Sequence, residues 1–155
     1  MQAQLNLNDY YINEYSFTVN RNHISGEKLC GSIDFDFDIS RNSSHPLDFM
    51  INIVIDLNSG EEDFQKCNYR IHLNITGFFS FEDGSTEDTI KKMIAPSGLA
   101  MLYGVSRGIV SSTTAMSWHG TFVLPSLNLI EIIKRKVEDS SAPQKKTRIK
   151  KTKKQ

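Results

Sequence analysis

The chain of 155 residues has little of what marks metalloproteins, redox proteins and secreted domains. It contains two cysteines, Cys30 and Cys67, and they form no C-x-x-C pair that would bind zinc or exchange disulfides. A disulfide between them is one possibility, but a reduced pair is expected because nothing else is typical of secretion. No run approaches the roughly 18 apolar residues of a membrane span, and the N-terminal residues are polar. The sequence therefore predicts a soluble, cytoplasmic protein with no membrane span.

Residue patterns that carry catalysis or bind cofactors are equally scarce. The four histidines, at positions 23, 45, 72 and 119, show no ligand spacing such as H-x-x-x-H. Gly104 and Gly108 are not followed by the Gly-Lys-Ser/Thr of a phosphate loop, and the hydroxyl-rich segment 106–114 lacks a G-x-S-x-G elbow. We therefore expect no enzymatic activity, no metal site and no cofactor.

The formal net charge of zero hides two parts of opposite charge. Residues 140–155 hold no acid and seven basic side chains: Lys145, Lys146, Arg148, Lys150, Lys151, Lys153 and Lys154. Without these seven, 11 basic residues face 18 acidic ones, which is a net charge of −7. We expect one folded domain over residues 1–139 and a disordered basic tail over residues 140–155. The tail either keeps the protein in solution or attracts nucleic acid or an acidic partner, without aromatic side chains for base stacking.

Four segments alternate apolar and polar side chains, as strands with one packed and one wet face do. They lie at residues 15–19, 33–39, 49–57 and 69–76. The polar connections between them are short, which favours antiparallel neighbours. In the second segment Asp34, Asp36 and Asp38 share one face and lie about 7 Å apart.

Helical patterns follow only after Gly84. Ser85 with Asp88 predicts the start of a first helix, and Pro96 fits the first turn of a second, longer helix that ends near Gly120. Asn128 with Glu131 predicts the start of a last helix. Strands first and helices afterwards indicate an α+β fold, a four-stranded antiparallel sheet with C-terminal helices on one face. The apolar surface of these helices exceeds what one sheet can cover, so we expect an oligomer.

From Thr76 to Lys136 the order of motifs resembles the SecB family of export chaperones. The motifs are Gly-Phe-Phe-x-Phe, Ala-Pro-x-x-Leu, a helical arginine and Leu-Pro-x-Leu-Asn-Leu. The matching residues are Gly77, Phe78, Phe79, Phe81, Pro96, Leu99, Arg107, Ile109, Leu124, Pro125, Asn128 and Leu129. The resemblance implies a SecB-like fold and a holdase that binds unfolded or aggregation-prone clients without ATP. It also implies a homotetramer, built as a dimer of dimers through the long helix.

Two roles within this resemblance stay open. One is protein export, in which an acidic sheet surface docks a SecA-type translocation ATPase. The other is a toxin–antitoxin–chaperone module, in which a SecB-like protein protects one antitoxin. The Leu102–Gly108 stretch differs from the family's Pro-Tyr-Ala-Arg-Glu segment, and the basic tail differs from the usual acidic or neutral one. Divergence of this size fits a dedicated role.

Candidate sites follow from this interpretation. The client-binding candidates are aromatic: Phe78, Phe79, Phe81, Tyr103, Trp118 and Phe122. Core packing is the alternative for these side chains, whereas an exposed apolar patch would bind polypeptide. Asp34, Asp36 and Asp38 are candidates for partner docking, or they form a solvated face that discourages edge pairing. Leu102, Ile109 and Met116 are candidates for the oligomer interface. An adaptor or nucleic-acid-associated protein acting through its tail remains the alternative function.

Overall fold

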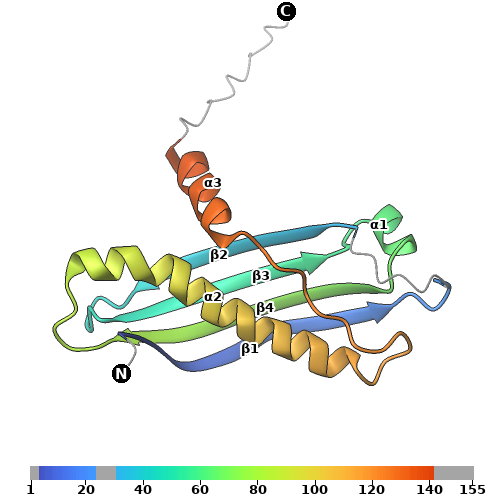
Figure 1. Ribbon diagram of the computed structural model, residues 1–155, viewed down its shortest axis with the longest axis horizontal. Helices are drawn as coiled ribbons and strands as arrows, with labels where there is room; N and C mark the ends of the chain where they lie inside the picture. Colours follow the sequence, from blue (N-terminus) through green and yellow to red (C-terminus); the bar gives the residue numbers. More distant parts are fainter. Residues whose placement is uncertain (1–3, 24–30, 142–155) are drawn as a thin grey trace, which may run out of the picture.

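The computed structural model describes residues 4–23 and 31–141. In chain order the elements are β1 (Leu5–Val19), β2 (Ile33–Arg41), β3 (Asp48–Leu57), α1 (Glu61–Gln65), β4 (Tyr69–Phe81), α2 (Glu87–Thr114) and α3 (Leu129–Ser141). Figure 1 shows α2 crossing one face of the sheet, while α3 stands beside the edge formed by β2. The predicted α+β class and the four antiparallel strands are confirmed. The short helix α1 was not expected from the sequence.

The strands lie in the order β1-β4-β3-β2. The expectation that β1 and β2 are neighbours was therefore wrong, because these two strands form opposite edges of the sheet. β1 instead pairs with β4 along its whole length, from Leu5 opposite Phe81 to Val19 opposite Tyr69. Two register shifts interrupt this pairing, near residues 8 and 13, and change which side chains of β1 face the helix.

The two central strands bury one face completely. Every second residue of β3 and β4 points toward α2 and is buried, and the residues between them are more exposed. The alternation predicted for these strands is confirmed, and each fully buried Ile or Leu contributes about 1.5–3 kcal/mol. The buried residues of the central strands are Phe49, Ile51, Ile53, Ile55, Leu57, Tyr69, Ile71, Leu73, Ile75, Phe79 and Phe81.

One continuous helix, α2, takes the place of the two expected after Gly84. It passes through Pro96 and begins at the N-cap Thr86, whose side chain accepts a hydrogen bond from the Thr89 N–H. The predicted cap at Ser85 was wrong. A proline inside a helix costs about 3 kcal/mol, and here the burial of nine α2 residues against the sheet outweighs it. The helix also stops before Gly120, with Ala115 as its C-cap.

By length and composition alone, α2 is long and apolar enough to cross a membrane, although no membrane span was predicted from the sequence. In the described chain α2 is the central helix of the core, because Leu99, Leu102 and Val110 are fully buried against the sheet. Central helices of folded domains pass the same test of length and hydropathy.

The last helix, α3, starts as predicted. The Asn128 side-chain oxygen accepts a hydrogen bond from the Glu131 N–H at 3.2 Å. The helix continues to Ser141, so residues 140 and 141, assigned to the tail by sequence, are helical. The rest of the predicted tail, residues 142–155, lies outside the described residues.

Of the two cysteines, Cys67 is a free thiol within the described chain and is buried. Burial raises the pKa of this thiol above its usual value. Cys30 lies outside the described residues, so the predicted reduced pair stays a prediction.

Candidate functional site

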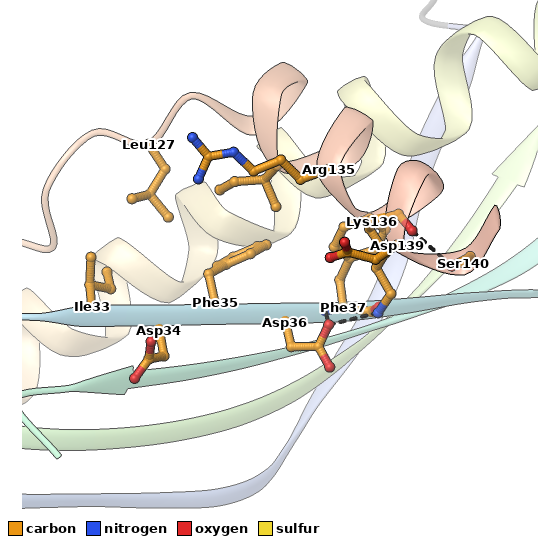
Figure 2. A pocket seen from close by; sticks show the side chains of 11 residues that line it. Ile33, Asp34, Phe35, Asp36, Phe37, Leu127, Arg135, Lys136, Asp139 and Ser140 are labelled. Atoms are coloured by element: carbon orange, nitrogen blue, oxygen red, sulfur yellow. Dashed lines mark hydrogen bonds and ion pairs between the residues drawn. The ribbon is translucent and has the colours of Figure 1, made fainter. Parts of the chain in front are cut away.

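A groove of about 640 Å³ lies between the edge strand β2 and helix α3. Figure 2 shows β2 side chains forming its floor, with α3 side chains and Leu127 above them. The apolar lining residues are Ile33, Phe35, Phe37, Leu127 and Ile132, and the polar ones are Asp34, Asp36, Arg135, Lys136, Asp139 and Ser140. The groove thus has an apolar floor and a charged rim.

The floor of this groove is attached to the core. The Phe35 ring packs edge-on against the Tyr103 ring of α2, with centroids 5.8 Å apart, and Phe37 is buried. Ile33 and Phe35 are only half-buried, and among the described strands β2 pairs with β3 alone. An edge strand presents unpaired backbone N–H and C=O groups to an added strand. The groove therefore combines apolar side chains with a strand edge that pairs with no other described strand. At Phe37 this edge is already occupied, since its N–H donates to Asp36 Oδ1 and its C=O accepts from Lys136 Nζ.

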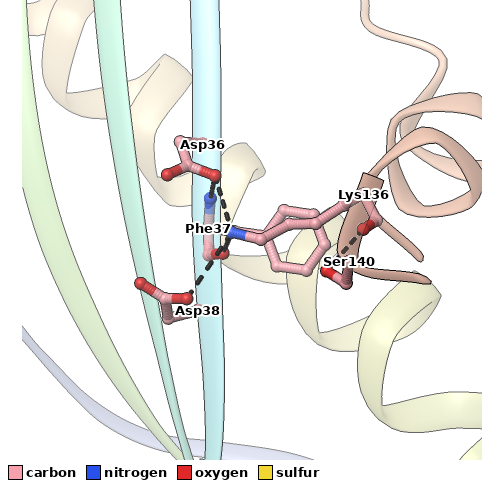
Figure 3. A network of polar contacts seen from close by, with 5 residues as sticks. All are labelled: Asp36, Phe37, Asp38, Lys136 and Ser140. Atoms are coloured by element: carbon pink, nitrogen blue, oxygen red, sulfur yellow. Dashed lines mark hydrogen bonds and ion pairs between the residues drawn. The ribbon is translucent and has the colours of Figure 1, made fainter. Parts of the chain in front are cut away.

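One lysine bridges α3 and β2 at the rim of the groove (Figure 3). Lys136 Nζ donates to Asp36 Oδ1 at 2.6 Å and to the Phe37 backbone oxygen, and lies 3.5 Å from Asp38 Oδ1. It also lies 4.7 Å from the centre of the Phe37 ring. The hydrogen bond from Lys136 holds the pKa of Asp36 below its usual value. Partial burial lowers the pKa of Lys136, but the pairing with Asp36 outweighs it, so that pKa is raised.

The six predicted client-binding aromatics fall into two groups in the structure, four buried and two exposed. Phe79, Phe81, Tyr103 and Phe122 are at most 5% exposed and belong to the core, so for these four the expected exposed groove was wrong. The reason is strand alternation and helix packing: Phe79 and Phe81 point toward α2 from β4. Closeness in sequence did not indicate which face each ring occupies.

The other two predicted aromatics are exposed and lie far apart in the fold. Phe78 is 39% exposed on the sheet face away from α2, where it packs edge-on against Tyr11 with centroids 5.8 Å apart. Trp118 is 71% exposed in the segment after α2, and Arg21 lies 5.5 Å from its ring centre. Neither side chain lines the groove between β2 and α3.

The three aspartates of β2 share one exposed face, as their alternation predicts. Asp36 and Asp38 contact Lys136, and Asp34 lies directly opposite Asp56 of β3. Docking of a partner on this face stays a prediction.

The predicted oligomer-interface residues differ in exposure. Leu102 is fully buried against the sheet, so it offers no surface to another copy, and this part of the prediction was wrong. Ile109 is half-buried, whereas Met116 is 93% exposed just beyond the end of α2. The outer side of α2 carries small residues instead, with Ala100, Gly104 and Gly108 exposed.

Histidines in the described ranges take structural positions. His72 Nδ1 lies 2.6 Å from Asp56 Oδ1, and its Nε2 lies 3.4 Å from Glu14 Oε2. His119 Nε2 lies 2.6 Å from the Asn20 backbone oxygen. Within residues 4–23 and 31–141, no group of three or more His, Cys, Asp or Glu side chains is arranged to hold a metal ion.

Sequence reasoning missed the groove residues Ile33, Phe35, Leu127 and Ile132 as a set. Their signal was present in part, because Ile33 and Phe35 belong to the most regular alternating segment. Nothing in the sequence indicates that this segment forms an edge strand or that α3 stands beside it.

No protein-family model matches this sequence. An uncharacterised protein of Methanocaldococcus jannaschii is 23% identical over 129 residues, which cover 83% of this chain and 81% of that protein. Among solved structures, the chain is similar to the SecB-like chaperone Rv1957 of Mycobacterium tuberculosis, solved in complex with a ChAD peptide from the HigA1 antitoxin. That similarity has a TM-score of 0.55 at 18% identity and covers 80% of this chain and 88% of the other. The SecB-like fold expected from the sequence is confirmed.

Proposed function

We propose that this protein is an ATP-independent chaperone that binds unfolded or aggregation-prone polypeptides in the groove between β2 and α3. One observation carries the proposal: on a SecB-like fold, a groove with an apolar floor lies along β2, which among the described strands pairs with β3 alone. A client in an extended conformation needs these two features, a place for its side chains and partners for its backbone.

The groove suits an extended apolar segment. A client strand would pair its backbone with β2 beside Ile33 and Phe35, because the backbone groups of Phe37 already bond Asp36 and Lys136. Backbone pairing gives affinity without dependence on client sequence. Side chains of such a strand recur about every 7 Å on one face, the spacing at which Ile33 and Phe35 follow each other. Arg135, Lys136 and Asp139 on the rim provide charged partners for polar side chains of the client.

The mycobacterial protein suggests the class of client, since its structure was solved with an antitoxin peptide. We infer that this chain likewise binds a short segment of an aggregation-prone protein, either an antitoxin or a protein destined for export. Binding of this kind draws its free energy from apolar burial and backbone pairing, so ATP should not change it.

The test is suppression of aggregation by matched single substitutions. The variants Phe35→Ser and Leu127→Ser remove apolar surface from the groove, whereas Ile130→Ser, at a 60% exposed position on α3, leaves the groove lining intact. We expect the wild type and Ile130→Ser to suppress light scattering by a destabilised client equally, with or without ATP. The groove variants should bind the client at least tenfold more weakly, as loss of a central apolar contact does.

The thermal midpoint of each variant separates lost binding from lost folding. If both groove variants remain folded and bind the client as the wild type does, the groove is not the binding site. If the wild type binds no unfolded polypeptide at micromolar concentration, the chaperone proposal itself fails.

We also propose that copies of the chain assemble through the outer side of α2. A Cβ added at Gly104 or Gly108 would meet nothing within 4 Å in the single chain, so this helix face is open and narrow enough for another helix to approach closely. Light scattering should report a multiple of 17.6 kDa for the wild type. The variant Gly104→Leu should shift the mass toward the monomer, and a monomeric wild type would contradict the assembly.

A further inference from the structure

The sheet has a second face, turned away from α2, and its side chains are strongly acidic. We call it the outer face. The strand register places seven carboxylates there: Asp9, Glu14, Asp34, Asp36, Asp38, Asp48 and Asp56. The same register gives the described part of this face one arginine, Arg70, and one histidine, His72. Among the described helices, α1 reaches one end of it, where Arg70 pairs with Glu61, and α2 lies on the opposite side of the sheet.

The arrangement of these carboxylates is unfavourable without a cation nearby. Asp34 and Asp56 are directly opposite each other on neighbouring antiparallel strands, where like charges destabilise the pair, and His72 contacts Asp56 on this face. Asp36 and Asp38 follow Asp34 on the same face. At this edge of the sheet a lysine already binds two of them, since Lys136 of α3 pairs with Asp36 and Asp38. The negative charge of the outer face therefore favours the binding of further ammonium groups.

The chain itself carries the matching charges. Residues 142–155 contain seven basic side chains and no acid, which equals the number of carboxylates on the outer face. They continue from Ser141, which, with Ser140, lines a hollow of about 510 Å³ together with Asp38 and Ile39 of β2. Fourteen extended residues reach roughly 46–50 Å, whereas the four strands span about 14 Å across. The segment is therefore long enough to cross the whole outer face.

We propose that residues 142–155 bind the outer face of the sheet in the same chain. Because the segment is joined to the domain at Ser141, its effective concentration at the outer face is about millimolar. Its binding to this face is therefore favoured over its binding to a free anion that is present at a lower concentration. The contact neutralises the net charge of −7 of the remaining chain and covers Asp34 and Asp56. The inference does not rest on client binding in the groove between β2 and α3, although Asp34 and Asp36 border both surfaces.

The test is carbodiimide cross-linking of the full-length protein, since this reagent joins a carboxylate to a lysine amine in direct contact. An equal mixture of ¹⁴N- and ¹⁵N-labelled protein separates bonds within a chain from bonds between copies by mass. We expect bonds within one chain, from lysines 145–154 to Asp34, Asp56 or Glu14, at 20 mM salt. At 0.5 M salt their yield should fall at least fivefold, because screening shortens the range of exposed charges.

A matched pair of variants locates the contact. Asp34→Asn combined with Asp56→Asn removes two carboxylates from the outer face and should lower the cross-link yield at least threefold. Glu82→Gln combined with Asp83→Asn removes the same charge from the loop before α2, and the yield should stay unchanged. The salt series on the wild type gives an answer even if the first variant does not fold.

Three results would overturn the proposal. The first is the absence of cross-links to the outer face at 20 mM salt. The second is cross-links that join only ¹⁴N to ¹⁵N chains, which would assign the contact to neighbouring copies. The third is tail cross-linking that is equally strong in both variants and at both salt concentrations, which would mean that charge on the outer face does not direct it.

Discussion

Helices α2 and α3 both carry apolar side chains at helical spacing, but the fold uses them differently. In α2, nine residues are buried against the sheet. In α3, none is buried, and its apolar side chains are half-covered or exposed. An apolar pattern in the sequence therefore identifies a helix with a preferred side, while the position of the helix decides whether that side forms core or a binding surface.

The contacts of α3 explain why its surface stays available. The helix stands beside an edge strand instead of lying on the sheet, and Lys136 is the side chain that joins it to β2 by hydrogen bonds. The other ion pair of α3, between Arg135 and Glu131, joins two residues of the helix itself. A helix with few buried contacts opens at a low free energy, which suits an element that borders a binding groove.

The largest expected effect comes from shortening a side chain under α2. Leu102→Ala removes a fully buried side chain and should lower the free energy of unfolding by about 2–5 kcal/mol. Ile130→Ala on α3 removes a 60% exposed side chain and should change it by less than about 0.5 kcal/mol. Urea unfolding followed by circular dichroism measures both.

This pair of substitutions also tests where copies of the chain meet. If Leu102 formed an interface, its substitution would change the oligomer mass at a nearly unchanged stability of each copy. Equal losses of stability at positions 102 and 130 would contradict the difference between the two helices.

Much of the fold follows from the sequence because strands alternate with a period of two. The inward faces of β3 and β4 can be predicted residue by residue from Phe49 to Leu57 and from Tyr69 to Ile75. The order of the strands could not be predicted, since pairing of β1 with β4 depends on contacts between residues 50 to 76 positions apart. Local patterns do not carry that information.

The sequence predicts the kind of candidate site, an apolar binding surface, but not the residues that form it. The sequence indicates a protein with surplus apolar surface, but it does not distinguish a buried aromatic from an exposed one, as Phe79 and Phe78 show side by side. Their difference comes from which face of β4 each occupies. The groove could not be found because it forms between two segments about 100 residues apart, at Phe35 and Lys136.

A second effect distinguishes the two sides of α2 itself. A Cβ at Gly98 would lie 2.4 Å from Ile51 Cδ1, so Gly98→Ala should lower the free energy of unfolding by about 1–3 kcal/mol. In the dissociated chain, at low protein concentration, Gly104→Ala meets nothing within 4 Å, and the higher helix propensity of alanine should stabilise the chain by up to about 1 kcal/mol. Thermal unfolding at several protein concentrations measures both changes.

Opposite signs for the two glycines would confirm that α2 has one close-packed and one open side. A loss of stability at Gly104→Ala that grows with protein concentration would place the proposed contact between copies at that position. Equal losses at every concentration would show that the outer side is packed within the chain.

A smaller effect is expected where α3 is joined to β2. Lys136→Gln removes the ammonium group from Asp36 and Asp38 and should weaken the attachment of α3 by roughly 0.5–1.5 kcal/mol. Amide hydrogen exchange in α3 should become about two- to tenfold faster, while exchange in α2 stays unchanged. Lys134→Gln, at an exposed position of the same helix, is the matched control and should leave both rates unchanged. Unaltered exchange in Lys136→Gln would mean that apolar contacts alone hold α3.

The smallest expected effect lies on the outer face of the sheet and depends on pH. The hydrogen bond to Asp56 raises the pKa of His72 above its usual value, despite partial burial. Because the folded pKa exceeds the unfolded value of about 6.5, protonated His72 stabilises the fold fully below that pH. This contribution, about 0.5–1 kcal/mol for a pair near the surface, is lost as the pH rises through the folded pKa.

Urea midpoints of the wild type and His72→Asn between pH 5.5 and 8.5 test this prediction. The wild type should be more stable than the variant at pH 5.5, and the difference should shrink as the pH increases. Asp56→Asn removes the main partner of the imidazole, so in that background the His72→Asn change should lose most of its pH dependence. If the difference instead grows with pH, neutral His72 is the stabilising form, and the ion pair with Asp56 does not contribute to folding.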